Sequence, residues 1–509
     1  MKIERTKNAT RNIVFNGMAQ LLNMLIPFVM RSVILHFLGV EYLGLGGLFR
    51  SIFSVLSLAE LGIGSAMIFS MYKPIAEDDT ETICAMMRLY KIVYRIIGLV
   101  VLGIGLILIP FLPYLVKDEV TADVNLYILY FMNLGSTVVS YWLFAYKHSI
   151  ISAHQRDDIA SKVIMVVHLI EYALKIAVLI ILKNYYIYLT LQIISQIAYN
   201  IIVAYRASKI FPQYSARGKL SRDKIIKIAC RVRDLFTSQF SNVISNSSDT
   251  LVISSFLGLT VLAVYQNYFY IISSLKTFIE VVSYACVAGI GNSLVTESIE
   301  KNYRDLRKIT VLFGWIMGIS STMFLCLAQP FMHIWMGEDN MLSFEYVVCF
   351  TIYHYSLGMN RLLSMFKDAA GIWRIDRWRP LVAAIVNLGL NLATVKWLGL
   401  YGVILSTVIS IVLVQIPWLF HNLFKAVYPK EYMWEYIRLF LSFSVVSFIA
   451  CITSWFLCSI IHLDVWPTLF INFGISFASS NLIFFAVYGR NELFKESVSQ
   501  IIRVIFRRK

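Results

Sequence analysis

Two arginines lie in the middle of the first two long apolar stretches of the chain. Arg31 falls in the stretch 13–38 and Arg50 in the stretch 43–71, and neither has a carboxylate three or four residues away. A charged side chain at the centre of a bilayer costs about 2.5–3.5 kcal/mol on insertion scales, so such groups normally face a bundle interior or a wet cavity. Guanidinium groups bind anionic oxygens through paired, charge-assisted hydrogen bonds. The two residues therefore predict an anion site in a polar chamber.

The spacing places these two arginines at a similar depth. Arg31 stands seven residues before Leu38, and Arg50 stands seven residues after Leu43. At the helical rise per residue, both would lie ~10 Å below the outer edge of the hydrocarbon layer, where they can reach one anion. Two alternatives remain open. Each side chain could extend outward to the interface, or pair with a distant acid such as Asp249, which an internal repeat aligns with the residue before Arg31.

Three further cations fall inside apolar stretches. Lys175 follows Glu171 by four residues, a favoured intrahelical ion pair, so a structural pair is the simpler interpretation. Lys276 precedes Glu280 by four residues in the weaker orientation, and it is left open between that pair and the chamber. Arg361 stands near the end of its stretch and either reaches the interface or binds substrate. Lys276 and Arg361 therefore join the two arginines as candidate anion ligands.

Four acids also fall inside apolar stretches, at Glu60, Glu171, Asp249 and Glu280. Transport driven by protons or sodium needs a carboxylate at membrane depth, but each of these groups could equally be the counter-ion of a nearby cation. The spacing favours a counter-ion role for Glu171. Glu60 and Asp249 remain open between the two roles, and all four acids are candidates for coupling or counter-ion duty.

The sequence contains none of the motifs that would predict catalysis. No P-loop, G-x-S-x-G or H-E-x-x-H motif occurs, and the seven cysteines are scattered without a C-x-x-C pair. The acidic run 77–79 is interpreted as a solvated turn rather than a metal site. We therefore expect no enzymatic activity, no cofactor and no metal.

The elements that must position these residues are membrane-spanning helices. The chain of 509 residues is 58% hydrophobic and only 15% charged, whereas soluble proteins are near 25% charged. We expect an all-α polytopic membrane protein with about fourteen spans. The predicted spans are 13–38, 43–71, 89–113, 124–146, 162–182, 186–206, 231–257, 261–287, 309–331, 345–366, 379–398, 401–421, 436–460 and 466–488.

Basic residues alternate along the loops in a way that fixes the orientation. The first residues, every second turn and the last residues are rich in Lys and Arg, whereas the opposite turns contain only Lys117, Lys183 and Lys396. By the positive-inside rule, both termini lie in the cytoplasm. The net charge of +15 is therefore interpreted as a topology signal beside anionic lipid headgroups, not as a nucleic-acid surface.

An internal repeat divides the chain. The segment 35–49 matches 254–269 in pattern, and in both segments a span ends in Leu-Gly before a short turn. The copies are about six spans apart, which predicts two six-helix lobes related as parallel repeats, with a substrate site between the halves. We expect an amino-terminal lobe at 1–206, a basic linker at 207–230, a second lobe at 231–424, and two extra helices with a basic cytoplasmic tail at 425–509.

A set of short motifs covers about the first hundred residues. They are Arg11-Asn12, FLGVEYLGL at 37–45, LAELGIGSA at 58–66, YKPIAE at 72–77, Tyr90-Lys91 and Tyr94-Arg95. This region resembles the amino-terminal part of bacterial O-antigen and capsular polysaccharide-unit flippases. These proteins belong to the multidrug/oligosaccharidyl-lipid/polysaccharide (MOP) superfamily.

The resemblance implies a function and a set of partners. It implies that an undecaprenyl-diphosphate-linked oligosaccharide moves from the cytoplasmic to the outer leaflet of the inner membrane by alternating access. It further implies membrane lipids, a polymerase and a chain-length regulator as partners. Related lipid II flippases use arginines on their first two helices for the diphosphate, and Arg31 and Arg50 lie on comparable helices. The alternatives are a cation-coupled multidrug exporter of the same superfamily and a membrane glycan polymerase; span one lacks the acid that the exporter would need.

Overall fold

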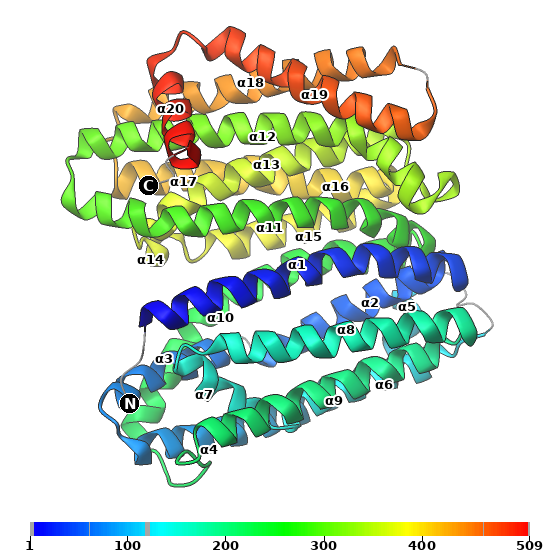
Figure 1. The fold of residues 1–509 in the computed structure, drawn as a ribbon, viewed down its shortest axis with the longest axis vertical. Helices are drawn as coiled ribbons and strands as arrows, with labels where there is room; N and C mark the ends of the chain where they lie inside the picture. Colours follow the sequence, from blue (N-terminus) through cyan, green and yellow to red (C-terminus); the bar gives the residue numbers. More distant parts are fainter. Residues whose placement is uncertain (1–4, 61, 118–122, 462, 507–509) are drawn as a thin grey trace. The chain divides into compact units, whose positions relative to one another are not determined.

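The computed structural model describes residues 5–60, 62–117, 123–461 and 463–506, and this part of the chain contains helices and no strands. Each predicted span coincides with helical structure, so the all-α polytopic membrane fold is confirmed (Figure 1). Ten of the described helical stretches are long and apolar enough to cross a membrane, and a helix pair bent by 45° forms an eleventh. The other three predicted spans, 43–71, 231–257 and 345–366, are not among these stretches.

The helices fall into two compact units, Met1–Ala263 and Val264–Lys509. This division does not test the boundaries that the repeat predicts for the two lobes and the linker, so those boundaries remain a prediction. The helices of the first unit are α1 Arg5–Phe37, α2 Val40–Leu56, α3 Ile63–Ala76, α4 Thr80–Leu108, α5 Leu112–Leu115, α6 Leu126–Trp142, α7 His148–Ala153, α8 Asp157–Ile181, α9 Tyr185–Ile210 and α10 Arg222–Phe256. Helix α11, Leu259–Thr296, begins in the first unit and continues into the second.

The second unit is built around one long central helix. Its remaining helices are α12 Ile299–Met336, α13 Phe344–Ala369, α14 Trp373–Asp376, α15 Arg379–Leu398, α16 Leu400–Ile409, α17 Ile416–Ala426, α18 Tyr432–Ser459, α19 Val465–Tyr488 and α20 Glu492–Phe506. Helix α12 packs against α13, α18, α19 and α20. Fully buried rings of Phe443 and Phe484 lie in the core that α18 and α19 build beside it.

The second predicted span is not the continuous helix that its apolar stretch suggested. It consists of α2, a 3₁₀ turn at Ser57–Glu60 and α3. Gly62 has a φ of 80°, in the left-handed region that glycine adopts without steric cost. It is the N-cap residue of α3, so the chain changes conformation at this residue before the new helix begins. The break places Glu60 on a tight turn, where its backbone is outside the regular hydrogen-bond ladder of either helix.

The two turns of the internal repeat have the same geometry. Gly39 follows α1 with a φ of 115°, and Gly258 follows α10 with a φ of 99°. In each case the two residues of the Leu-Gly pair donate their N–H groups to a single carbonyl, that of Ile34 or that of Ile253. The repeated Leu-Gly motif therefore specifies a repeated helix end, in which a glycine with a positive φ follows the last helical turn.

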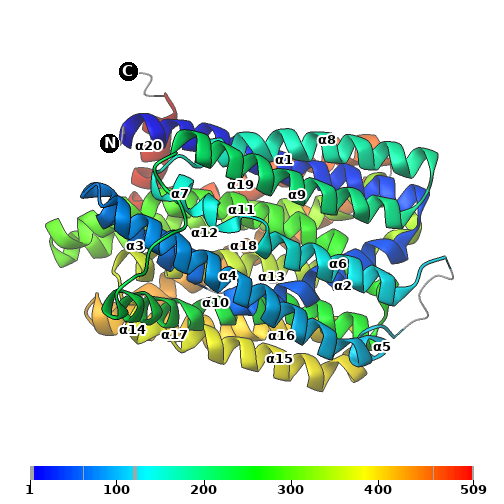
Figure 2. The ribbon, with the colours of Figure 1, turned by 90° about the horizontal axis from the view of Figure 1, so that it is seen from below.

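Three helices of the first unit form a wall that carries Arg31 and the Glu171–Lys175 pair. Helix α8 packs along α1 on one side and along α9 on the other, and the three lie side by side in Figure 2. Helix α2 packs against α10 and also contacts α1 and α6. A Cβ atom at Gly44 would collide with the backbone carbonyl of Leu259, so glycine permits the close approach of α2 to the start of α11.

The end of the chain, expected to be a basic tail, forms the helix α20. Its Phe494 is 2% exposed and lies in the core beside α12. Glu496 forms ion pairs with Lys308 at 2.8 Å and Arg304 at 2.5 Å, and the hydrogen bond from Lys308 is the main reason that the pKa of this carboxyl lies below its ordinary value. An apolar contact and two ion pairs thus fasten α20 to the cytoplasm-proximal end that we predict for α12.

Candidate functional site

The structure brings three of the membrane-embedded cations together within the first unit. Arg50 on α2 lies within electrostatic range of Lys175 on α8 and of the phenol groups of Tyr172, Tyr185 and Tyr188. Arg31 on α1 also acts on Tyr188. We call Arg31, Arg50 and Lys175 the cationic cluster. One tyrosine is therefore within electrostatic range of two arginines that come from two helices.

Arg50 is the one exposed position of α2. The helix is otherwise buried or half-buried along its whole length, because α1, α6 and α10 surround it. Among the described residues, the Arg50 side chain forms no hydrogen bond and no ion pair. An exposed guanidinium that has no partner in the protein keeps its five N–H donors available for an anionic ligand.

Arg31 is half-buried and anchored differently. Its Nη2 lies 3.5 Å from the carbonyl oxygen of Ala263, in the first turn of α11. Asp249, proposed above as its distant partner, is 8% exposed on α10. The pairing of Arg31 with Asp249 remains a prediction.

Lys175 and Glu171 form the intrahelical ion pair that their spacing predicts. Nζ of Lys175 lies 2.6 Å from Oε1 of Glu171, and both side chains are buried. The same ammonium group donates to Gln192 at 3.3 Å and lies 4.3 Å from the ring centre of Tyr188. The pair is neutral as a unit, so it adds no net charge to the cationic cluster.

Tyrosines hold the wall behind the cluster in place. Tyr185 is buried, stacks on Tyr188 with 5.5 Å between ring centres, and meets the edge of Tyr42 at 5.0 Å. The absence of a side chain at Gly46 leaves room for the Tyr185 hydroxyl group, 3.4 Å from where a Cβ would stand. Rigid aromatic faces beside cations suit a ligand that combines charge with sugar rings.

Glu60 occupies a separate site, at the break between α2 and α3. The hydroxyl group of Tyr94 donates a short hydrogen bond to its carboxylate, and Tyr90 donates to Tyr94 at 2.9 Å. Tyr141 on α6 also lies within electrostatic range of the carboxylate. Within the described part of the chain, no cation pairs with Glu60. This carboxylate is held only by neutral groups, which favours a coupling role over a counter-ion role.

The remaining candidates belong to the second unit. Nζ of Lys276 lies 3.8 Å from Glu280 on α11, and both side chains are more than one third exposed. A loose pair of this kind neutralises part of the charge without fixing either group. Arg361 on α13 contacts Asp368 at 3.3 Å, and its guanidinium carbon lies 4.8 Å from the ring centre of Tyr284.

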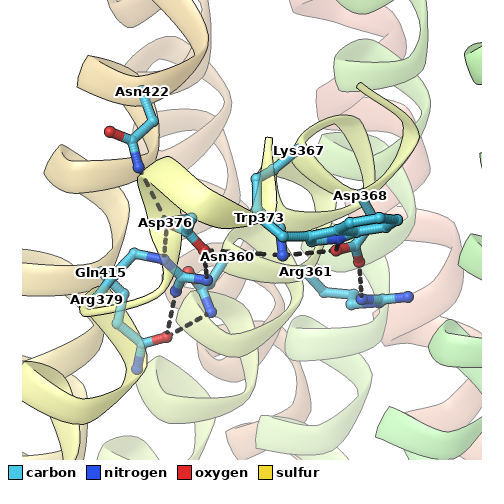
Figure 3. A network of polar contacts seen from close by, with 9 residues as sticks. All are labelled: Asn360, Arg361, Lys367, Asp368, Trp373, Asp376, Arg379, Gln415 and Asn422. Atoms are coloured by element: carbon cyan, nitrogen blue, oxygen red, sulfur yellow. Dashed lines mark hydrogen bonds and ion pairs between the residues drawn. The ribbon is translucent and has the colours of Figure 1, made fainter. Parts of the chain in front are cut away.

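Arg361 stands at one end of a polar network that the sequence did not predict (Figure 3). At its centre Arg379 donates two hydrogen bonds, of 2.7 and 2.8 Å, to the carboxylate of Asp376, and both residues are almost fully buried. Gln415 accepts from Arg379 at 3.1 Å and closes a π-helical turn, a feature frequent at functional sites. The other members are Asn360, Lys367, Asp368, Trp373 and Asn422. The network joins the ends of α13, α15 and α17.

The part of the chain that the structure describes contains no group of three or more His, Cys, Asp or Glu side chains arranged as metal ligands.

Comparison with known proteins places the chain in a family. Residues 9–287 match the sequence profile described as "Polysaccharide biosynthesis protein", whereas no curated protein matches the chain by sequence. Among solved structures, the lipid II flippase MurJ in an inward closed conformation superposes with a TM-score of 0.67 at 15% identity, over 94% of this chain and 99% of that one.

Two multidrug transporter structures show the same fold. An inward-facing MATE family transporter of the MOP superfamily superposes with a TM-score of 0.62 at 15% identity, over 79% of this chain and 94% of its own. The MATE transporter VcmN of Vibrio cholerae gives 0.54 at 16% identity, over 82% and 96%. The fold is thus that of MOP superfamily transporters, and because the profile spans more than half of its length, the chain belongs to the polysaccharide biosynthesis protein family.

Proposed function

We propose that this protein flips undecaprenyl-diphosphate-linked oligosaccharide units from the cytoplasmic to the outer leaflet of the bacterial inner membrane. The units would supply O-antigen, capsule or exopolysaccharide assembly, with a polymerase and a chain-length regulator acting next. The observation that carries the proposal is the position of Arg31 and Arg50 around Tyr188, with Arg50 lacking any described ion pair. Membership of the polysaccharide biosynthesis family supports the same substrate class.

The chemistry of the cluster matches each part of such a substrate. A diphosphate is multiply charged and needs cations in a region of low dielectric, where guanidinium–phosphate contacts are strong. The sugars need stacking faces and hydrogen-bond partners, which Tyr172, Tyr188 and Gln192 supply beside the cations. The polyprenyl chain can stay in the lipid while the head group crosses. Lys276 and Arg361 are further candidate ligands that belong to the second unit.

Glu60 is the carboxylate that we assign to coupling. Its hydrogen bond from Tyr94, with no described cation beside it, leaves the group able to gain and lose a proton without breaking an ion pair. Asp249 and Glu280 are the other coupling candidates, and Glu171 is assigned to Lys175 as counter-ion. Both termini lie in the cytoplasm, as the distribution of basic residues predicts.

The test uses a bacterial strain that lacks its own flippase and makes no surface polymer. Arg31→Ala and Arg50→Ala should each abolish surface polysaccharide while the protein remains in the membrane, and Arg50→Lys should retain part of the activity because it keeps the charge but loses the paired geometry. Arg206→Ala, at the exposed end of α9, is the matched control. Normal polymer from both alanine variants at low expression would overturn the proposal.

A drug-export assay separates the second candidate function. The MATE structures share the fold, and a carboxylate such as Glu60 is what a cation-coupled exporter would use. Drug resistance that depends on Glu60 and is indifferent to Arg31 and Arg50 would favour the exporter. Sugar transfer by the purified protein would instead indicate a polymerase.

A further inference from the structure

A second cation-rich site lies where the chain between α9 and α10 folds back onto the start of α4. The N–H group of Ser215 donates to the sulfur of Cys84 at 3.3 Å, and Nη1 of Arg88 donates to the carbonyl of Gly218 at 2.9 Å. Gly218 has a φ of 84° and lies against Ala85. The connecting segment, expected from its composition to be a simple basic linker, is thus fastened to α4.

Two adjoining cavities open beside this segment, and together we call them the linker pocket. The first has a volume of about 570 Å³ and the second about 430 Å³, and Thr82 and Lys224 line both. Volumes of this size are typical of small-molecule sites. The linker pocket is enclosed entirely by residues of the first unit, from α3, the start of α4, the connecting segment and the first turns of α10.

Cations outnumber acids on the walls of the linker pocket. Its basic residues are Lys73, Arg217, Lys219, Lys224, Lys227 and Arg231, and its acidic residues are Glu77, Asp79 and Glu81. Two of the acids are already engaged. Glu77 pairs with Lys73 at 3.6 Å, and Asp79 accepts a hydrogen bond of 2.9 Å from the N–H group of Thr82. The side-chain hydroxyl group of Thr82 is the main reason that the pKa of Asp79 is lowered, and the N–H group of Thr82 is the second.

Several of the cations are available for a ligand. Among the described residues, the side chains of Arg217, Lys219 and Lys227 form no hydrogen bond and no ion pair. Lys224 donates to the hydroxyl group of Thr82 at 2.9 Å, which holds its ammonium group between the two cavities. Ser221 lines the first cavity as the N-cap of α10, yet its side chain does not cap the helix, so the first N–H groups of α10 add to the positive potential there.

The second cavity has an apolar flank beside its cations. Phe69 and Tyr72 on α3 are 58% and 42% exposed, and the guanidinium of Arg231 lies 4.7 Å from the ring centre of Phe69 while donating to Ser70 at 2.7 Å. Large exposed rings next to an arginine suit a molecule with an apolar chain and an anionic head. The positive-inside rule assigns this end of the unit to the cytoplasm, at the membrane surface.

We propose that the linker pocket binds the phosphate-bearing head group of an amphiphile at the cytoplasmic face. The cationic first cavity takes the phosphate, and the rings of Phe69 and Tyr72 contact the chain. The amphiphile is either an anionic phospholipid or a prenyl diphosphate, and only the second source rests on the proposed function, as a reception site before the substrate reaches the cationic cluster. A merely solvated basic loop would need neither the fastened backbone nor the cavity.

The test measures binding to purified full-length protein in nanodiscs of phosphatidylcholine. The probes are a short-chain phosphatidylglycerol, farnesyl diphosphate and inorganic pyrophosphate, each titrated and counted by native mass spectrometry. The double variant Arg217→Ala/Lys219→Ala should weaken binding about tenfold or more, since it removes two charge-assisted contacts. Its matched control, Arg206→Ala/Lys209→Ala, removes the same charge from the exposed end of α9 and should change affinity less than about twofold.

The pattern across probes identifies the source. Binding of phosphatidylglycerol alone assigns the linker pocket to membrane lipid, binding of farnesyl diphosphate alone assigns it to a prenyl diphosphate, and binding of all three probes assigns it to phosphate itself. Equal loss in the double variant and its control, or no saturable binding to the wild-type protein, overturns the proposal. Lys224→Ala, which changes a side chain that lines both cavities, gives a second variant if the double one misfolds. Arg31→Ala should leave intact the part of the binding that Arg217→Ala/Lys219→Ala removes, which keeps the outcome separate from that of the proposed flippase activity.

Discussion

Breaking the buried pair of Glu171 and Lys175 should destabilise the first unit in an asymmetric way. Glu171→Gln leaves the Lys175 ammonium buried beside the guanidinium of Arg50, with no carboxylate between them. Lys175→Gln leaves Glu171 buried, and we expect Arg50, which acts on the neighbouring Lys175, to compensate part of its charge. Removing one partner of a buried ion pair costs about 3–5 kcal/mol. We expect Glu171→Gln near the upper end of that range and Lys175→Gln near or below the lower end.

The double variant Glu171→Gln/Lys175→Gln should recover most of the loss. It removes both charges together, so no buried charge is left uncompensated, and replacing a whole buried pair by neutral groups is often close to neutral in stability. For a unit of this size, each kcal/mol corresponds to about 2–4 °C in the unfolding midpoint. The Glu171→Gln variant alone should therefore lose roughly 10–20 °C, with a smaller loss for Lys175→Gln.

The assay is the temperature at which half of the detergent-solubilised protein still elutes as a single species on size-exclusion chromatography. Membrane proteins commonly unfold irreversibly, so the ranking of the four proteins at one heating time is compared rather than an equilibrium free energy. Lys175→Gln more damaging than Glu171→Gln would refute the electrostatic role given to Arg50. A double variant as unstable as the sum of the two single losses would refute the pairing itself.

Four further outcomes follow from single contacts. Glu60→Gln should leave the protein folded but make flipping in proteoliposomes insensitive to an imposed proton gradient, and a flipping rate that still follows the gradient would exclude Glu60 from coupling. Gly44→Ala should lower the yield of folded protein, because its Cβ would collide with a backbone carbonyl, whereas Gly17→Ala, with no atom within 4 Å, should be harmless. Asp376→Asn should lower the unfolding midpoint, since it strips a buried guanidinium of its charged partner at a cost of about 3–5 kcal/mol, and an unchanged midpoint would show that the network is solvated. The protection of α20 amides against hydrogen exchange, corrected for the intrinsic exchange rate at each pH, should fall as the pH falls through the lowered pKa of Glu496, because a carboxyl with a depressed pKa stabilises the fold only while it is ionised; corrected protection that is constant from neutral to acid pH would contradict this.

The helices and the Lys175–Glu171 pair were predictable because both depend on local spacing. Long apolar stretches specify spans, and a four-residue separation places two side chains on one face of a helix. The Leu-Gly repeat likewise specified two equivalent turns, since glycine is the residue that ends a helix with a positive φ. In each case, the signal lies within a few consecutive residues.

Other features depend on residues far apart in the chain, which one sequence does not connect. The turn at Ser57–Glu60 lies inside an apolar stretch, and only the left-handed Gly62 hints at the break. The contact of Glu60 with Tyr94 joins two separate spans, and Gln415 reaches Arg379 across another such gap. From composition, the basic residues of the linker pocket and of α20 were interpreted only as determinants of membrane orientation. Composition cannot show that a basic segment packs against a helix.

The two groups central to the proposed transport cycle stand on one interrupted segment of the chain. Arg50 is the exposed residue of an otherwise buried or half-buried α2. Glu60 lies on the turn that follows this helix, where it accepts a hydrogen bond from Tyr94. Because α2 is buried along most of its length, we expect a change at the turn to reach Arg50 as a movement of the whole helix. Protonation of Glu60 and binding of an anion at Arg50 are therefore expected to be coupled through α2 rather than by direct contact. On this view Arg50→Ala weakens substrate binding, whereas Glu60→Gln leaves binding intact and uncouples it from the proton gradient. An exporter whose coupling acid contacts its substrate would lose both properties together.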